Sequence, residues 1–124
     1  MNETPIHVLV VDDDALTASL TGMVLEEAGY DVTLAEGGLD ALEQLKVGSA
    51  IRAVVSDLNM PGMDGLQLFQ ELRRLGHDQL FVVLTGDGAE PLKAAHPDLD
   101  AVVTKDEQFQ ETLPETLAAL LSRA

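Results

Sequence analysis

The chain carries acidic side chains at places where they could hold a cation together. Asp12 and Asp13 directly follow the apolar run Ile6–Val11, and Asp57 directly follows a second run, Ala53–Ser56. Carboxylates held close together repel one another unless a proton or a metal ion offsets their charge. With oxygen ligands and no cysteine in the chain, the preferred ion would be a hard cation, Mg²⁺ before zinc or copper.

A hydroxyl and an ammonium group stand at similar places later in the chain. Thr85 follows the apolar run Leu80–Leu84, and Lys105 comes shortly after the run Ala101–Val103. A metal ion, a hydroxyl and an ammonium group around a carboxylate are the parts needed for phosphoryl transfer to that carboxylate. Whether Asp57 has these neighbours depends on the fold.

Runs rich in β-branched residues alternate with segments of helical period along the chain. The patterns predict strands at Ile6–Val11, Asp31–Ala35, Ala53–Ser56, Leu80–Leu84 and Ala101–Val103. They predict helices over Ala15–Gly29, Leu39–Val47, Leu66–Leu75 and a C-terminal segment, with a short helix before the fifth strand. This alternation, with strands that are apolar throughout, indicates an α/β three-layer sandwich in which a parallel sheet lies between two helical layers. In such a sheet the ligand site lies beyond the carboxyl ends of the strands, where the polar residues above stand.

Single residues predict where the helices begin, end and face. Asp14 and Asp64 are expected to cap the first and third helices. The first helix has an apolar stripe at helical spacing, formed by Leu16, Leu20, Met23 and Val24. We expect this stripe to pack in the core. Pro114 requires that the last helix start near Leu113 or break there.

Composition and charge argue against several classes of protein. The 124 residues, of which 46% are apolar, are enough for one domain with a hydrophobic core. Seven basic against 22 acidic residues give a net charge of −15, which disfavours nucleic acid as a partner. The lack of cysteine excludes a disulfide scaffold and a cysteine nucleophile. No apolar run approaches the roughly 20 residues that span a bilayer, and the N-terminus lacks a signal-peptide pattern, so we expect a cytoplasmic protein.

The sequence around Asp57 resembles that of a known family. The segment Val54–Gly65 (VVSDLNMPGMDG) is similar, almost residue for residue, to the phosphoacceptor strand and loop of the receiver domain of bacterial two-component response regulators. Three further pieces match the family in order and spacing: Val8–Asp13, Val82–Gly86 and Lys105. The similarity runs from about Ile6 to Leu121, which implies a single receiver domain over residues 1–124 with a core over about 6–121.

The resemblance implies a CheY-like, flavodoxin-like fold with strand order 2-1-3-4-5, and it implies a metal site. Asp57 would be the phosphorylated nucleophile. The side chains of Asp12, Asp13 and Asp57 would hold Mg²⁺ as the cofactor. The backbone carbonyl of Asn59 would be a further ligand.

The resemblance also implies roles around the phosphoryl group. Lys105 would pair with it, and Thr85 would move to hydrogen-bond it while the small Gly86 leaves its oxygens room. The donor would be a sensor histidine kinase or a histidine phosphotransfer protein, and a water near Asn59 and Asp87 would later hydrolyse the acyl phosphate. The chain would be a signalling phosphoacceptor rather than an enzyme, acting through contact with an unidentified downstream protein. A homodimer stays open, and no nucleic-acid or membrane partner is expected.

The segment between Thr85 and Lys105 departs most from the family pattern. Val102 stands where the family usually has an aromatic residue whose rotamer follows the threonine, and Asp106 stands where it usually has proline. A valine side chain has too little reach to signal in that way. We therefore expect the chemistry to be retained and the readout to rely on the Thr85 loop and the short fourth helix.

Three other interpretations remain. The first is a receiver-like interaction module whose site is not phosphorylated, although all the site residues are present. The second is a haloacid-dehalogenase-type phosphatase, which would need an aspartate where Asn59 stands, two residues after the nucleophile. The third is a flavodoxin-like flavin binder, which would need a hydroxyl-rich first turn where this chain has carboxylates.

Overall fold

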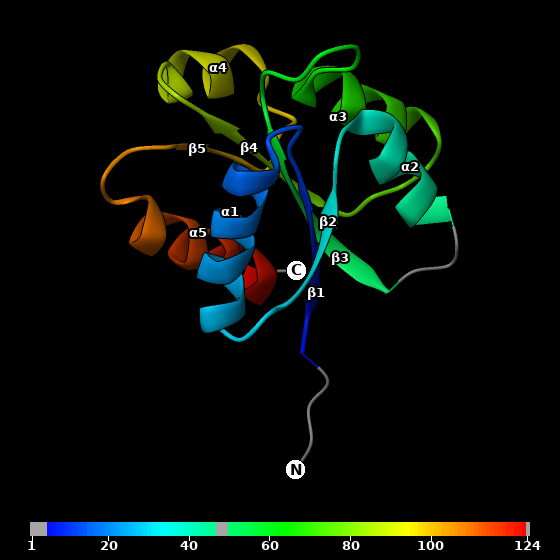
Figure 1. Cartoon of the computed structure of the whole chain (residues 1–124). Coiled ribbons are helices and arrows are strands. Elements are labelled where there is room, and N and C mark those ends of the chain that lie inside the picture. The colour runs from blue at the N-terminus through cyan, green and yellow to red at the C-terminus, as the bar shows by residue number, and fades with distance from the viewer. Residues whose placement is uncertain (1–4, 47–49, 124) are drawn as a thin grey trace.

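The computed structural model describes residues 5–46 and 50–123, and within them strands and helices alternate as predicted (Figure 1). The strands are β1 (His7–Val11), β2 (Asp31–Ala35), β3 (Ile51–Asp57), β4 (Leu80–Thr85) and β5 (Ala101–Thr104). The helices are α1 (Ala15–Glu27), α2 (Gly38–Lys46), α3 (Gly65–Arg74), α4 (Ala89–Ala95) and α5 (Phe109–Arg123). Val47, the last residue of the predicted second helix, lies outside the described residues. None of the described helices is long and apolar enough to cross a membrane.

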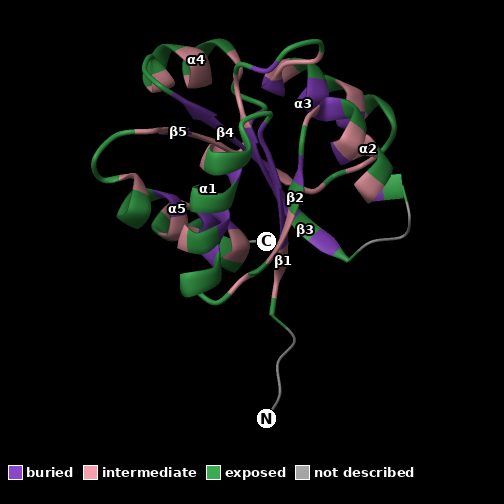
Figure 2. Cartoon of the chain, in the orientation of Figure 1, coloured by how far each residue is buried: buried purple, intermediate pink, exposed green. Residues whose placement is uncertain are grey.

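The five strands form one parallel sheet with the order β2-β1-β3-β4-β5, which confirms the expected fold class. Val8 and Val10 of β1 face a cluster built with α1 and α5, whereas Leu9 and Val11 face a cluster built with α2 and α3. Both faces of β1 are thus buried, as Figure 2 shows for the centre of the sheet. This is why the strand is a continuous apolar run rather than an alternating one.

The predicted caps of α1 and α3 are both present. The Asp14 side chain accepts hydrogen bonds from the backbone N–H groups of Leu16 and Thr17 at 3.0 and 3.2 Å. The Asp64 side chain accepts one from the Gln67 N–H at 2.8 Å, and the Gln67 side chain accepts one in return from the Asp64 N–H, which makes a capping box. Each cap satisfies amide groups that the first helical turn leaves without a partner.

The predicted core stripe of α1 is wrong for most of its residues. Leu16, Leu20 and Met23 are 69%, 53% and 56% exposed. The helix instead buries a face that includes Ala18 and Gly22, and a Cβ added to Gly22 would lie 3.4 Å from side chains of β2. Small residues let the helix approach the sheet closely, so the larger apolar residues are left on the outside.

The expectation for Pro114 is also wrong, because α5 begins at Phe109 and continues through the proline. The first turn of α5 lies before Pro114, and in it the N–H groups of Glu111 and Thr112 donate to the Gln108 carbonyl. Proline removes the N–H that would bond to the Gln110 carbonyl. Gln110 is exposed, so water can take the place of that donor.

Candidate functional site

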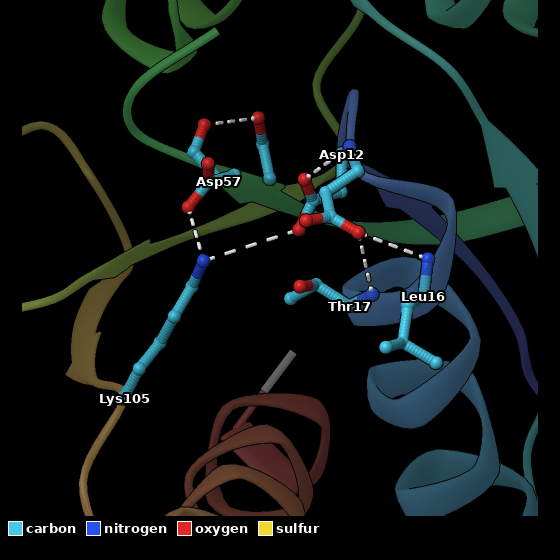
Figure 3. Close-up of polar contacts among 7 residues, drawn as sticks. Asp12, Leu16, Thr17, Asp57 and Lys105 are labelled. Carbon is cyan, nitrogen blue, oxygen red and sulfur yellow. Dashed lines mark hydrogen bonds and ion pairs between the residues drawn. The ribbon is translucent and has the colours of Figure 1, made fainter.

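The predicted site residues meet at the carboxyl edge of the sheet. Asp12 directly follows β1, Asp57 and Thr85 are the last residues of β3 and β4, and Lys105 directly follows β5. Figure 3 shows the side chains of Asp12, Asp57 and Lys105 pointing toward one another. Parallel strands end at the same edge, so their last residues are neighbours even though the sequence separates them widely.

The three carboxylates Asp12, Asp13 and Asp57 form a cluster in which one oxygen of each lies within 4.8 Å of the others. Asp12 is buried, Asp57 is half-buried and Asp13 is exposed. The cluster is therefore open to solvent on one side, which suits an ion that keeps several of its waters. Oxygen ligands alone, two or three of them carboxylates, fit Mg²⁺.

Burial is the largest of the effects that raise the pKa of Asp12 above its ordinary value. The charges of Asp57 and Asp13 raise this pKa further, while the Asp14 N–H, 2.9 Å from Asp12 Oδ1, and the Lys105 ammonium lower it. Burial and the neighbouring carboxylates together thus outweigh the two donors at Asp12. A divalent cation would relieve this repulsion.

Among the described residues, Lys105 is the cation that faces the cluster. Its Nζ lies 2.5 Å from Asp57 Oδ1 and 3.9 Å from Asp12 Oδ2 (Figure 3). Its backbone N–H donates to the Thr85 carbonyl at 2.8 Å, so the end of β4 fixes where the lysine leaves the sheet. The ammonium group is therefore placed where it could contact a group attached to Asp57.

Thr85 reaches the same edge, but its hydroxyl does not point to Asp57. It donates to the backbone carbonyl of Asp87 at 2.8 Å, within the loop that leads to α4. Asn59 and Asp87 are both exposed beside this edge. The Asn59 carbonyl remains a predicted metal ligand.

Sequence reasoning included Gly65 in the segment that resembles the family but missed its close approach to the backbone of Asp57. A Cβ on Gly65 would lie 2.6 Å from the Asp57 carbonyl oxygen, and the Gly65 N–H donates to the Leu58 carbonyl at 2.9 Å. A glycine in the first turn of a helix, where better helix formers are available, was the signal for such a close approach.

The residues that depart from the family pattern take ordinary structural roles. Val102 packs half-buried against the same core cluster as Leu92 of α4. The Asp106 side chain accepts a hydrogen bond from the Gln108 N–H at 3.0 Å, and the Asp106 carbonyl accepts one from the Phe109 N–H at 3.1 Å. Asp106 thus forms the turn that leads into α5.

Comparison with known proteins agrees with this architecture. A family model for the response regulator receiver domain matches residues 8–116. The transcriptional regulatory protein FixJ of Bradyrhizobium diazoefficiens is 34% identical over 121 residues, which is 95% of this chain and 56% of FixJ. The transcriptional regulatory protein GlrR of Escherichia coli is 38% identical over 91 residues, which is 73% of this chain and 20% of GlrR. The chain therefore spans about a fifth to a half of the length of these relatives.

A solved structure shows the same fold. The response regulator protein TrrA from Thermotoga maritima, in complex with Mg²⁺ and beryllofluoride, is 30% identical, with a TM-score of 0.82 over 93% of this chain and 98% of that one. The family match covers most of the chain and includes the strands that carry the acidic cluster and the lysine. The chain belongs to the response regulator receiver domain family.

Proposed function

We propose that this receiver domain accepts a phosphoryl group on Asp57 in a reaction that depends on Mg²⁺, and that it signals through contact with another protein. The observation that carries the proposal is the meeting of Lys105 with the acidic cluster, with its Nζ 2.5 Å from Asp57 Oδ1. A carboxylate nucleophile beside a cation and two further metal-binding carboxylates suits phosphoryl transfer.

Asp12, Asp13 and Asp57 would hold Mg²⁺, with the Asn59 carbonyl as a further ligand. Bound Mg²⁺ would supply positive charge for the oxygens of the transferred phosphoryl group. TrrA, which carries Mg²⁺ and beryllofluoride in its structure, supports this assignment by similarity. The raised pKa of Asp12 is consistent with it, because burial and, to a lesser degree, the charges of Asp57 and Asp13 disfavour the ionised carboxylate, and a bound cation would offset both effects.

The transfer would begin with a phosphohistidine of the donor placed opposite Asp57. A carboxylate oxygen of Asp57 attacks the phosphorus, an O–P bond forms, the P–N bond breaks, and the imidazole leaves with its electron pair. Lys105 would pair with the transferred oxygens, and the Thr85 hydroxyl would leave the Asp87 carbonyl to donate to one of them. Water near Asn59 and Asp87 would later hydrolyse the acyl phosphate.

The exposed ridge of α1, formed by Leu16, Leu20 and Met23, offers the donor a docking surface next to the site. Beside it lies a hollow of about 490 Å³ between α1 and the start of α5, lined also by Phe109 and Lys105. Large exposed apolar groups that gather at one place mark sites of protein contact. We propose that a sensor histidine kinase or histidine phosphotransfer protein docks here.

The test is incubation with Mg²⁺ and a small phosphodonor such as phosphoramidate, followed by mass spectrometry of the intact protein. The wild type should gain one phosphoryl group, and Asp57→Asn and a sample with a metal chelator should gain none. A folded wild-type protein that stays unmodified with donor and Mg²⁺ would contradict the proposal. It would favour an interaction module whose site is not phosphorylated.

A further inference from the structure

Lys105 follows β5, a strand whose own sequence does little to define its register against β4. β5 has four residues, Ala101–Thr104, and lies at the edge of the sheet, where β4 is its single neighbour. Val103 packs with the α1 and α5 cluster and Val102 with the cluster on the opposite face. A shift of one residue would still leave apolar side chains on both faces, so the hydrophobic pattern specifies the register weakly.

Asp100 supplies the missing register signal. Its backbone N–H donates to the Phe81 carbonyl at 3.1 Å, and its Oδ2 accepts a hydrogen bond from the Phe81 N–H at 2.8 Å. One residue therefore engages both backbone groups of Phe81. The observed pairing of Ala101 with Val82 follows directly from this attachment.

Arg73, near the end of α3, forms an ion pair with the Asp100 carboxylate. Its Nη2 lies 3.7 Å from Asp100 Oδ2, and the guanidinium donates to the carbonyls of His77 and Gln79 at 2.9 and 2.7 Å. The same group lies over the ring of Phe69, 4.8 Å from its centre. Contacts with Phe69 of α3 and with the connection into β4 thus fix the Arg73 guanidinium independently of Asp100.

The opposite end of β5 carries the lysine of the site. The Lys105 N–H bonds to the Thr85 carbonyl, and its ammonium contacts Asp57. A slip of β5 by one residue would move this backbone by roughly 3.3 Å and turn each side chain to the other face of the sheet. Such a shift would take the Lys105 ammonium away from Asp57.

We propose that Asp100, through its two hydrogen bonds to the Phe81 backbone, is a positioning residue that sets the register of β5 and so places the Lys105 ammonium for phosphoryl transfer. The proposal rests on the proposed function of Asp57, but the register itself can be measured without any phosphorylation. The Asp100 contacts lie at the amino ends of the strands, remote from the carboxylates that would bind the metal.

The rate of phosphorylation by phosphoramidate at saturating Mg²⁺ tests the effect on the site. Asp100→Ala should lower the rate about tenfold or more, toward the loss of about a hundredfold expected for Lys105→Ala. Asp100→Asn keeps an acceptor for the Phe81 N–H, so the rate should stay within about twofold of the wild type. Asp98→Ala, an exposed change in the same loop, is the matched control and should leave the rate unchanged.

Two measurements distinguish a displaced Lys105 from a general loss of stability in Asp100→Ala. Mg²⁺ affinity should not fall in Asp100→Ala, because Asp12, Asp13 and Asp57 lie on or after β1 and β3. In a Lys105→Ala background, Asp100→Ala should cause no further loss of rate, since the two changes act through one group. An equal loss in both backgrounds would overturn the proposal.

Hydrogen exchange of the Lys105 amide tests the register directly in the metal-free protein. This amide is protected by its bond to the Thr85 carbonyl, so Asp100→Ala should raise its exchange rate while Asp100→Asn should not. Unchanged protection in Asp100→Ala would overturn the positioning role even if the wild type is readily phosphorylated. An unphosphorylated wild type whose Lys105 amide loses protection in Asp100→Ala would contradict the proposed function and leave the register role in place.

Discussion

Asp12 is a carboxylate that the fold buries without enough opposite charge. It is 4% exposed, and its pKa is raised above the ordinary value of 3.8, chiefly by burial. The Asp14 N–H and the Lys105 ammonium, 3.9 Å from Asp12 Oδ2, offset this effect in part. The ionised Asp12 carboxylate therefore lowers the stability of the metal-free protein, and a cation in the cluster would offset this loss.

We expect Asp12→Asn to raise the free energy of unfolding of the metal-free protein at neutral pH. The raised pKa means that the folded state binds a proton more tightly than the unfolded state does. The contribution of Asp12 to stability therefore improves as the pH falls through its folded pKa toward 3.8. The gain from Asp12→Asn should shrink over that range and vanish below it.

Urea unfolding in a metal chelator, from pH 7 downward, measures this gain. Asp14→Asn is the matched control, because asparagine caps a helix about as well as aspartate and Asp14 is exposed. That variant should show no comparable gain at neutral pH. A metal-free Asp12→Asn protein that is less stable than the wild type at pH 7 would contradict the prediction.

Among the elements, α4 is the helix that the core holds least. It has no buried residue, whereas each of the other helices buries several. It begins after Gly88, whose φ of 69° is left-handed, and no side chain caps it. The Thr85 hydroxyl donates to the Asp87 carbonyl and so connects the site with the loop that leads into this helix.

We expect that a group bound at Asp57 changes the conformation of α4 through Thr85. With Mg²⁺ and beryllofluoride, which stands in for the phosphoryl group, the Thr85 hydroxyl should turn from the Asp87 carbonyl to the new acceptor. Amide chemical shifts over residues 86–95 should then change, and in Thr85→Ala these changes should be largely lost. Loss of the hydroxyl bond should itself lower the free energy of unfolding by about 1 kcal/mol.

Thr104→Ala, at the position paired with Thr85 in the sheet, is the control for removing a threonine at this edge. It should keep the shift changes in α4. If the changes stay confined to the residues around Asp57, or persist in Thr85→Ala, the route through Thr85 is wrong.

The elements also show what the sequence could predict. The alternation of strands and helices and both aspartate caps followed from local patterns. The meeting of Asp57 with Lys105 followed from them too, because parallel strands bring their last residues to one edge, whereas the order of the strands in the sheet came from the family resemblance. The exposed face of α1 did not, since that helix is apolar on several sides and only the close approach of Gly22 to β2 decides which side is buried. The Asp100 side chain contacts Phe81, 19 residues earlier in the chain. A hydrophobic pattern in the sequence cannot predict such a contact.

At the scale of the whole molecule, a net charge of −15 disfavours the compact state, and the carboxyl edge of the sheet concentrates part of that repulsion. Any salt will screen the dispersed charges, but a cluster with three carboxylate oxygens within 4.8 Å should respond to Mg²⁺ in particular. Binding to the folded state alone raises stability by mass action, by about 2.7 kcal/mol when the free ion is at 100 times its dissociation constant.

We therefore expect Mg²⁺ to raise the Tm of the wild type at neutral pH well beyond KCl of the same ionic strength. Asp13→Asn should lose most of this difference, because it removes one of the proposed ligands at an exposed position without disturbing the core. Asp31→Asn, which removes an equal charge at another exposed position, should keep it. Calorimetry of the three proteins in both salts makes the comparison. Equal responses to Mg²⁺ in Asp13→Asn and Asp31→Asn would mean that the ion acts by general screening and that the cluster is not a metal site.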